Sequence, residues 1–284
     1  MHPPPTPQVR TRMCAAHDHA RAALGLRLGP APDSTEAWGW NGRTLGRPVD
    51  TPTGPGWLRL AAAPSGHTDH VFWSGNHDAD AVLPVGTPRP ARRANLDWHD
   101  HTWSYRAELF DHTTDPPISP TATLTDTPTL PPRWWAELRA TLTAISAVPT
   151  SRHTTDQHYL DWSVPTFLDP DMDTTTTSWT TAHGDLHWAN LCAPRLQILD
   201  WEGFGRAPAG YDAVMLHTHS LLAPDLAEHV HAELAATLDT PTGRFAELAV
   251  IAELLHNAAD GNTTIPTRPL RRRAAHLLDR AKDD

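Results

Sequence analysis

The sequence pattern changes along the chain from short strand-like runs to helical spacing, and this change constrains the fold more than any other feature of the sequence. In the first part, short runs at 36–40, 57–60 and 102–110 alternate with glycine and proline, which is typical of strands joined by turns. Helical patterns follow a segment rich in Thr, Pro and Asp. The sequence therefore predicts an α+β protein, with a small antiparallel sheet lobe over residues 1–110 and a larger, mainly helical lobe over residues 111–284.

Apolar spacing predicts where the main helices lie. One helix is expected at 9–26 in the sheet lobe, and others at 132–145, 243–257 and 269–284 in the helical lobe. The last of these begins with the charge run of Arg271, Arg272 and Arg273. We interpret that run as a solvated helix face, because charged residues on a surface helix point to water.

Composition excludes several classes of protein. The 284 residues carry a formal net charge of −10, and an acidic surface repels nucleic acid while it attracts cationic small molecules. No apolar run reaches the roughly 18 residues of a membrane span, and no signal-type segment opens the chain. Cys14 and Cys192 are too few for a disulfide scaffold. We therefore expect a cytoplasmic protein that binds neither nucleic acid nor membrane.

One stretch of the helical lobe carries a spaced set of polar residues. Residues 183–191 read His-Gly-Asp-Leu-His-Trp-Ala-Asn-Leu, and residues 196–202 read Leu-Gln-Ile-Leu-Asp-Trp-Glu. Asp185 and Asn190 share one loop, and Asp200 closes an apolar run that predicts a strand. Phosphoryl transfer needs a carboxylate that accepts the proton of the attacking hydroxyl, and an amide oxygen and second carboxylate that hold Mg²⁺. The spacing indicates such a site.

Zinc binding is an alternative interpretation of the same segment. His183 and His187 are four residues apart, as two zinc ligands on a helix would be. No third ligand lies nearby at a usual spacing, and Gly184 weakens a helix at this position. The phosphoryl-transfer interpretation is therefore favoured.

These two segments resemble the catalytic loop and metal-binding strand of the aminoglycoside phosphotransferase and choline kinase superfamily. The following stretch, Gly-Arg-Ala-Pro-Ala-Gly-Tyr-Asp at 205–212, resembles the Gly-x-x-Pro-x-x-x-Asp stretch of the same superfamily. The strong match covers residues 181–216, and the order of the lobes extends it more loosely over the chain. The resemblance implies a bilobal protein kinase-like fold.

The resemblance also implies a role for each matching residue. Asp185 is expected to be the catalytic base, and Asn190 and Asp200 the ligands of Mg²⁺. His183 is expected to brace the loop. Asp212 is expected either to cap a helix, as an Asp at a helix start does, or to tie the loop down.

The nucleotide-binding half departs from the superfamily pattern. The single lysine of the chain is Lys282. Arg59, in the run Gly-Trp-Leu-Arg-Leu, is therefore expected at the position of the superfamily's phosphate-binding lysine. Arginine keeps the charge but presents a planar fork with different reach. The acidic partner of this residue is expected to be Asp78 or Asp80.

Two other parts of the sheet lobe are expected to touch the nucleotide. The glycine-bearing stretch 38–46, which includes Gly42, is expected to cover the phosphates, because glycine lets backbone N–H groups approach an anion. The backbone of Glu108 and Leu109 is expected to bond the adenine.

These features predict an Mg-ATP-dependent phosphotransferase that moves the γ-phosphoryl group of ATP to a hydroxyl of a small polar molecule. The acidic charge and the patch of Asp169, Asp171 and Asp173 would suit a cationic acceptor such as an aminoglycoside-type antibiotic or an amino alcohol. The alternative is a nucleotide-binding pseudokinase or regulatory module, suggested by the missing lysine. The complete set of base and metal ligands favours the enzyme.

Overall fold

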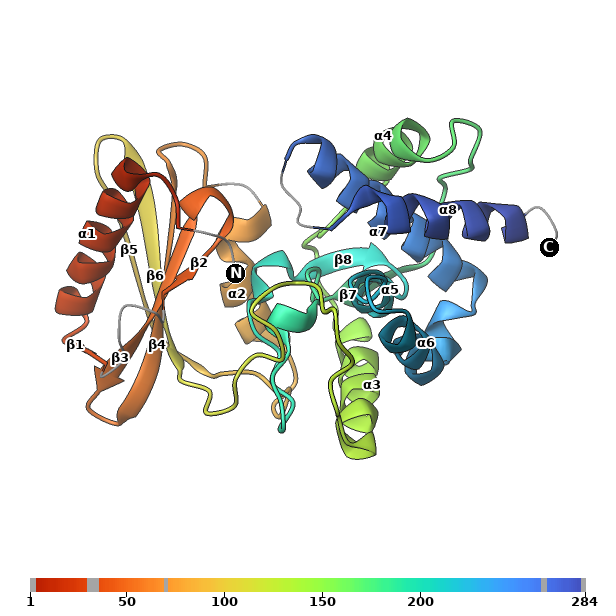
Figure 1. The fold of residues 1–284 in the computed structure, drawn as a ribbon. Helices are drawn as coiled ribbons and strands as arrows, with labels where there is room; N and C mark the ends of the chain where they lie inside the picture. The colour runs from red at the N-terminus through yellow and green to blue at the C-terminus, as the bar shows by residue number, and fades with distance from the viewer. Residues whose placement is uncertain (1–3, 30–35, 69–70, 262–264, 282–284) are drawn as a thin grey trace. The chain divides into compact units, whose positions relative to one another are not determined.

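The computed structural model describes residues 4–29, 36–68, 71–261 and 265–281. They fall into two compact units (Figure 1). The N-terminal unit consists of Met1–Trp73 and Arg89–Pro116, and the C-terminal unit of Ser74–Pro88 and Pro117–Asp284. Each unit buries an apolar core of its own. The break lies after the boundary expected at residue 110, and Ser74–Pro88 belongs to the helical unit although it precedes the last two strands of the sheet.

An antiparallel sheet forms the body of the N-terminal unit. Its strands are β1 (Arg27–Leu28), β2 (Ala37–Trp38), β3 (Thr44–Thr51), β4 (Gly54–Pro64), β5 (Arg92–His99) and β6 (Trp103–Asp111). They lie in the order β1–β3–β4–β6–β5, and β2 pairs with β3. Helix α1 (Pro7–Ala23) packs against this sheet, where the buried His17 bonds through Nε2 to the carbonyl oxygen of Leu58 at 3.1 Å. The predicted sheet lobe is confirmed.

The sequence pattern does not reveal β3, because Gly46 and Pro48 interrupt it. Gly46 is required by packing, since a Cβ there would lie 2.5 Å from the ring of Trp57 on the neighbouring strand. Pro48 lies opposite Trp57 in the β3–β4 register. The stretch 38–46, expected to be one glycine-bearing turn, is therefore a turn over 39–43 between β2 and β3.

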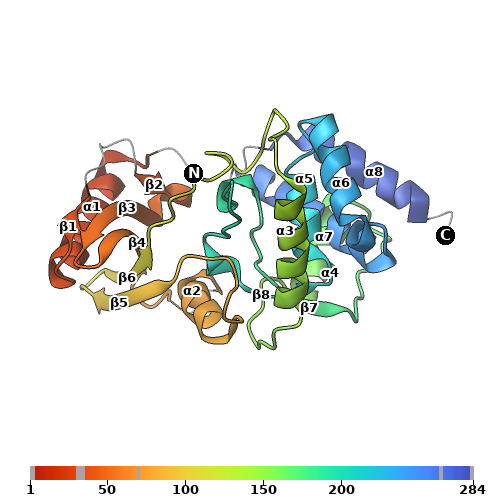
Figure 2. The same ribbon diagram turned by 90° about the horizontal axis from the view of Figure 1, so that it is seen from below.

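Helices dominate the C-terminal unit (Figure 2). They are α2 (Val71–Val82, in this unit from Ser74), α3 (Pro132–Ser146), α4 (Gln157–Phe167), α5 (Tyr211–Thr218), α6 (Pro224–Leu238), α7 (Pro241–Ala259) and α8 (Thr267–Ala281). A hairpin of β7 (Trp179–Ala182) and β8 (Gly205–Pro208) accompanies them. Helix α7 packs against α4, α5, α6 and α8, and its residues 246–252 are all buried. The α+β prediction is thereby confirmed.

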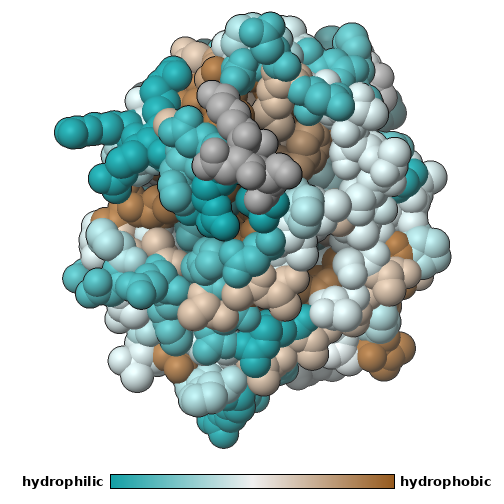
Figure 3. Space-filling model, turned by 90° about the vertical axis from the view of Figure 1, so that its right-hand side faces the viewer, coloured by the Kyte–Doolittle hydropathy of each residue, from teal (hydrophilic) through white to brown (hydrophobic). Residues whose placement is uncertain are grey.

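The surface of the molecule shows no large apolar area on the side drawn in Figure 3. Apolar residues lie there in separate small patches among hydrophilic ones. Within the described residues, no helix combines the length and the hydropathy that a membrane span requires.

Helix α2 makes a close backbone contact inside the C-terminal unit. Its Gly75 lies against the 3₁₀ turn at 201–203, so that a Cβ on this residue would be 2.0 Å from the carbonyl oxygen of Glu202. Arg152, in the loop after α3, donates from Nη1 to Oδ2 of Asp78 on the same helix at 2.8 Å. Only glycine lets the helix approach the turn this closely.

The substitution Gly75→Ala tests this contact. We expect it to destabilise the C-terminal unit by about 1–3 kcal/mol, because the added methyl group meets backbone that cannot rotate away. The free energy of unfolding in urea, followed by circular dichroism, measures the effect. Val82→Ala, on the same helix with a side chain that is 44% exposed, is the control and should change stability by less than about 0.5 kcal/mol. Equal stability of the two variants would contradict the contact.

Candidate active site

The carboxylate of Asp212 holds the start of the loop that follows β7. Its Oδ2 accepts the backbone N–H of His183 at 2.7 Å, and its Oδ1 accepts that of Gly184 at 3.0 Å. Asp212 is buried in the first turn of α5, a helix whose N-cap is Gly210. Burial raises the pKa of Asp212, while His183 and the two N–H donors act in the opposite sense. These two bonds join the start of the loop to α5.

His183 joins the two ends of the candidate site. Its Nδ1 accepts the backbone N–H of Asp185 at 3.2 Å, so the ring proton lies on Nε2, which donates to the carbonyl oxygen of Leu199 at 2.8 Å. Burial lowers the pKa of His183, which suits a neutral ring. Both ring nitrogens are occupied by these bonds, which argues against the zinc alternative. His183 thus bonds the loop at Asp185 and the backbone at Leu199.

The side chain of Asn190 folds back onto Asp185. Its amide nitrogen donates to the carbonyl oxygen of Asp185 at 2.9 Å and lies 3.5 Å from the carboxylate Oδ2 of the same residue. The side chain is buried. Because the nitrogen of the amide is used in this way, its oxygen is the atom that is left to hold a cation.

A short hairpin brings Asp200 next to this loop. The backbone N–H of Leu199 donates to the carbonyl oxygen of Asn190 at 2.9 Å, and Leu191 and Ile198 form a single antiparallel bridge. The strand expected before Asp200 is thus reduced to one bridge. Asp200 itself is exposed and left-handed, with a φ of 58°, a costly conformation for a residue with a Cβ.

Asp185 lies in a group of histidines. Its side chain is 41% exposed, and its Oδ2 is 3.5 Å from Nε2 of His187. Burial of the loop would raise the pKa of Asp185, but His187, His183 and His219 together hold it well below its usual range. The pKa of His187 is raised, since the attraction of Asp185 outweighs the effect of burial. Asp185 is therefore a carboxylate at neutral pH.

Several residues behind this loop were not expected from the sequence. The ring of His219 lies 5.4 Å from that of His187, and burial lowers its pKa to about 3. Glu253 on α7 accepts a hydrogen bond from the hydroxyl of Tyr211. Burial raises the pKa of Glu253 to about 7, and the charge of Asp185 adds to the shift. An acid inside the apolar run of α7 is a signal in the sequence that could have identified Glu253.

The nucleotide-binding candidates lie in the N-terminal unit. Arg59 on β4 stands opposite Glu108 on β6, and its Nη1 is 3.3 Å from Oε2 of that residue, with both side chains nearly buried. Glu108 is therefore an acidic partner of Arg59. Asp78 bonds Arg152, and the expectation that Asp78 or Asp80 pairs with Arg59 stays a prediction.

The backbone of Glu108 and Leu109 does not fit the adenine-binding role. Both residues lie inside β6, which is paired with β4 on one side and β5 on the other. Their N–H and C=O groups face neighbouring strands, and the expectation is corrected on this ground.

Gly42 is buried under the start of α1. A Cβ there would lie 2.7 Å from Pro5 and from Val9. The backbone N–H of Gly42 bonds the carbonyl oxygen of Gly39 at 3.0 Å, so it is used within the turn itself. This corrects the expectation that Gly42 presents its N–H to a phosphate. Lys282 lies outside the described residues.

The acidic patch expected to attract a cationic acceptor lies on the loop after α4. Asp169 accepts the backbone N–H of Asp171 at 3.0 Å, and Asp173 accepts that of Thr175 at 2.9 Å. The second of these bonds lowers the pKa of Asp173. The observed role of Asp169 and Asp173 is therefore to stabilise turns of their own loop.

The substitution Glu253→Gln tests the burial of this carboxyl. Its pKa of about 7 exceeds the ordinary value of 4.5, so the stability that it contributes is present in full below pH 4.5 and lost as the pH rises through 7. Glutamine cannot ionise, and we expect Tm of the variant minus Tm of the wild type to increase from pH 5 to pH 8. Glu228→Gln, at an exposed position of α6, is the control. A difference independent of pH would contradict the inference.

Comparison with known proteins gives a likeness in structure alone. No family model and no curated protein matches the sequence. A thermostable mutant of aminoglycoside phosphotransferase APH(4)-Ia, in ternary complex with AMP-PNP and hygromycin B, matches with a TM-score of 0.61 and 13% identity over 95% of this chain and 100% of that one. Amicoumacin kinase hAmiN, in complex with AMP-PNP, Ca²⁺ and Ami, matches with a TM-score of 0.58 and 11% identity over 97% and 96%. The chain therefore has the protein kinase-like fold of these phosphotransferases, as the resemblance of residues 181–216 implies.

Proposed function

We propose that the chain is an ATP-dependent phosphotransferase that moves the γ-phosphoryl group to a hydroxyl of a small polar molecule. The observation that carries the proposal is the arrangement of Asp185, Asn190 and Asp200. A carboxylate and an amide touch each other on one loop, and the backbone bond from Leu199 to Asn190 brings the chain just before Asp200 next to that loop. The fold is also that of proteins solved with an ATP analogue.

In this proposal Asp185 orients the acceptor hydroxyl and takes its proton. The hydroxyl oxygen forms a bond to the γ-phosphorus, the bond from that phosphorus to the bridging oxygen of ADP breaks, and the proton goes to the carboxylate. The attraction of His187 and its contact with the carboxylate help to keep Asp185 ionised before the reaction, and its partial exposure leaves an oxygen accessible. Asn190, which donates to the backbone of Asp185, fixes the loop in this position.

The residues present fit a magnesium ion. The amide oxygen of Asn190 and the carboxylate of Asp200 are hard oxygen donors, which Mg²⁺ prefers. When bound, the ion neutralises charge on the phosphates of the nucleotide. The left-handed backbone at Asp200 supports its assignment to the site, because such strain is concentrated at functional positions.

The nucleotide phosphates are proposed to bind Arg59. Glu108 holds the guanidinium from one side, so it is fixed before a ligand arrives. Arginine donates two parallel bonds to phosphate, and a guanidinium fixed in this way gives up little freedom on binding. In this proposal Glu108 acts through its side chain.

The acceptor is proposed to be cationic, as an aminoglycoside-type antibiotic or an amino alcohol is. The support is the net charge of −10 together with the carboxylate of Asp185, whose charge also raises the pKa of Glu253. The similar proteins were solved with hygromycin B and with Ami. A panel of aminoglycosides and amino alcohols, incubated with Mg²⁺ and ATP and analysed for ADP and phosphorylated product, tests the function.

The substitution Asp185→Asn is the central test. Loss of the proton acceptor should lower kcat by about 10²–10⁴-fold, and ATP should still raise Tm, because the amide keeps the size of the side chain. ADP release and thermal unfolding provide the two measurements. Asp126→Asn, an exposed residue outside the loop, should retain full activity. Unchanged turnover in Asp185→Asn would refute the assignment, and a protein that binds ATP without any turnover would be the pseudokinase.

The role of Arg59 is tested by removing the whole ion pair. The double variant Arg59→Met with Glu108→Gln removes both charges of this pair, so neither is left buried without the other, and circular dichroism checks that the variant folds. We expect KM for ATP to rise by about 10-fold or more, the loss of one or two charge-assisted hydrogen bonds, while KM for the acceptor stays the same. The control is Arg47→Met with Glu36→Gln, which removes another ion pair of the same unit. An equal KM for ATP in both double variants would exclude Arg59 from the phosphate site.

A further inference from the structure

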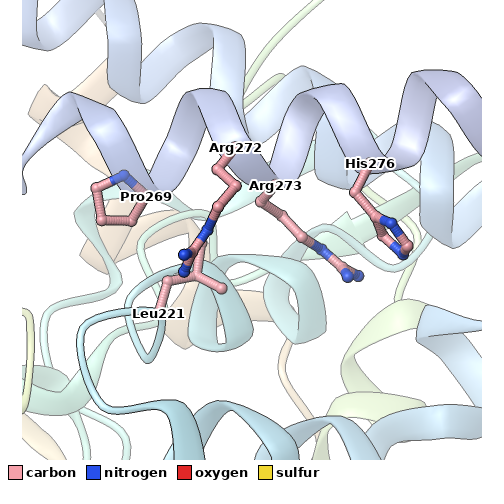
Figure 4. Close-up of a pocket in the computed structure, with 5 residues that line it drawn as sticks. All are labelled: Leu221, Pro269, Arg272, Arg273 and His276. Atoms are coloured by element: carbon pink, nitrogen blue, oxygen red, sulfur yellow. The ribbon is translucent and has the colours of Figure 1, made fainter.

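A small basic pocket lies along helix α8, apart from the residues assigned to catalysis. It has a volume of about 360 Å³ and is lined by Leu221, Pro269, Arg272, Arg273 and His276. Figure 4 shows the two arginines and the histidine extending from α8 on the same side as Leu221. Positions 269, 272, 273 and 276 share one face of a helix, because they follow the i, i+3, i+4, i+7 spacing. The charge run interpreted from the sequence as a solvated face is thus partly the wall of a pocket.

Arg273 is held in place from inside the protein. Its Nε and Nη2 donate to the two carboxylate oxygens of Glu247, each at 2.8 Å. Glu247 is fully buried, and its Oε1 also lies 2.8 Å from Nδ1 of His217. The two-point bond fixes the plane of the guanidinium and leaves its Nη1 for another acceptor. Arg273 therefore presents a fixed donor to the pocket.

Arg272 adds a charge that the surrounding chain does not balance, and His276 adds a ring nitrogen that can donate. Both side chains are exposed, and neither forms an ion pair with any residue that the structure describes. The chain as a whole has a net charge of −10, so a convergence of basic groups runs against its general composition. Such a group of donors around a hollow is suited to an anion.

We propose that this pocket binds the phosphate group of a small ligand, either a phosphomonoester or inorganic phosphate. Two guanidinium groups and an imidazole supply more donors than a single carboxylate can use, whereas a phosphate dianion has three oxygens to accept them. The volume is that of a small-ligand site, and Leu221 and Pro269 offer an apolar wall to an organic group.

The pocket is connected to the loop of Asp185 through the end of α5. Leu221 lies just after α5. Ser220, the residue before it, accepts the indole N–H of Trp188 through Oγ at 3.0 Å, and the ring of His219 lies edge-on to that of His187. Trp188 and His187 belong to the loop itself. A ligand against Leu221 therefore touches a segment that supports the loop, although binding does not depend on the proposed phosphotransferase function.

Calorimetric titration of the full chain with phenyl phosphate, inorganic phosphate and benzoate tests the proposal. We expect both phosphates to bind and benzoate to bind at least 10-fold more weakly, because it carries one charge and two oxygens. Tighter binding of phenyl phosphate than of phosphate would assign the natural ligand to the phosphomonoesters, and equal binding would assign it to the free ion. Benzoate binding as tight as phenyl phosphate would overturn the phosphate assignment.

Two arginine variants locate the binding. Arg272→Gln should weaken phenyl phosphate at least 10-fold, which is the loss of a charge-assisted hydrogen bond. Arg271→Gln is the matched control, since it removes the same charge one position away at a residue that does not line the pocket. Both positions are exposed, so both variants should fold, which circular dichroism checks. Equal affinity in the two variants, whether retained or lost, would overturn the site.

Discussion

The two hydrogen bonds from the backbone of His183 and Gly184 to Asp212 are the interaction on which the rest of the candidate site depends. They join the loop after β7 to the first turn of α5, so the loop is fixed to a helix that is buried along its whole length. A buried carboxylate that accepts two N–H groups leaves no alternative partner for them. The loop beyond this point can therefore be short and still place Asp185 and Asn190 reproducibly.

Sequence reasoning reached this loop because the chemistry is contained in local spacing. Asp185 and Asn190 touch because they share one tight turn, so their spacing in the sequence is enough to predict the contact. Arg59 and Glu108 are different, since 49 positions separate them and only the pairing of β4 with β6 sets them opposite each other. A strand register is fixed by the packing of the whole sheet, which single positions in a sequence do not show.

The same reason explains which elements escaped prediction. Periodicity identifies a helix only when one face is polar, and α5 has no polar face because all its residues are buried. A proline inside α4, at Pro165, and a glycine and proline inside β3 resemble breaks in the sequence. In the folded chain Gly46 is the place where Trp57 packs. A glycine that resembles a turn signal in the sequence is here required by packing, and only the position of Trp57 on the neighbouring strand reveals this.

Glycine has a comparable role around Asp200. Gly184 has a φ of +88°, and a Cβ there would lie 2.2 Å from the carbonyl oxygen of Gly203, while Gly75 approaches Glu202 of the same turn. Backbone from the loop after β7 and from α2 thus presses on the turn that follows Asp200. Such contacts cannot relax by a change of rotamer, as contacts between side chains can. They hold Asp200 in a left-handed conformation that it would not adopt by itself, and the cost of that strain is offset by packing throughout the C-terminal unit.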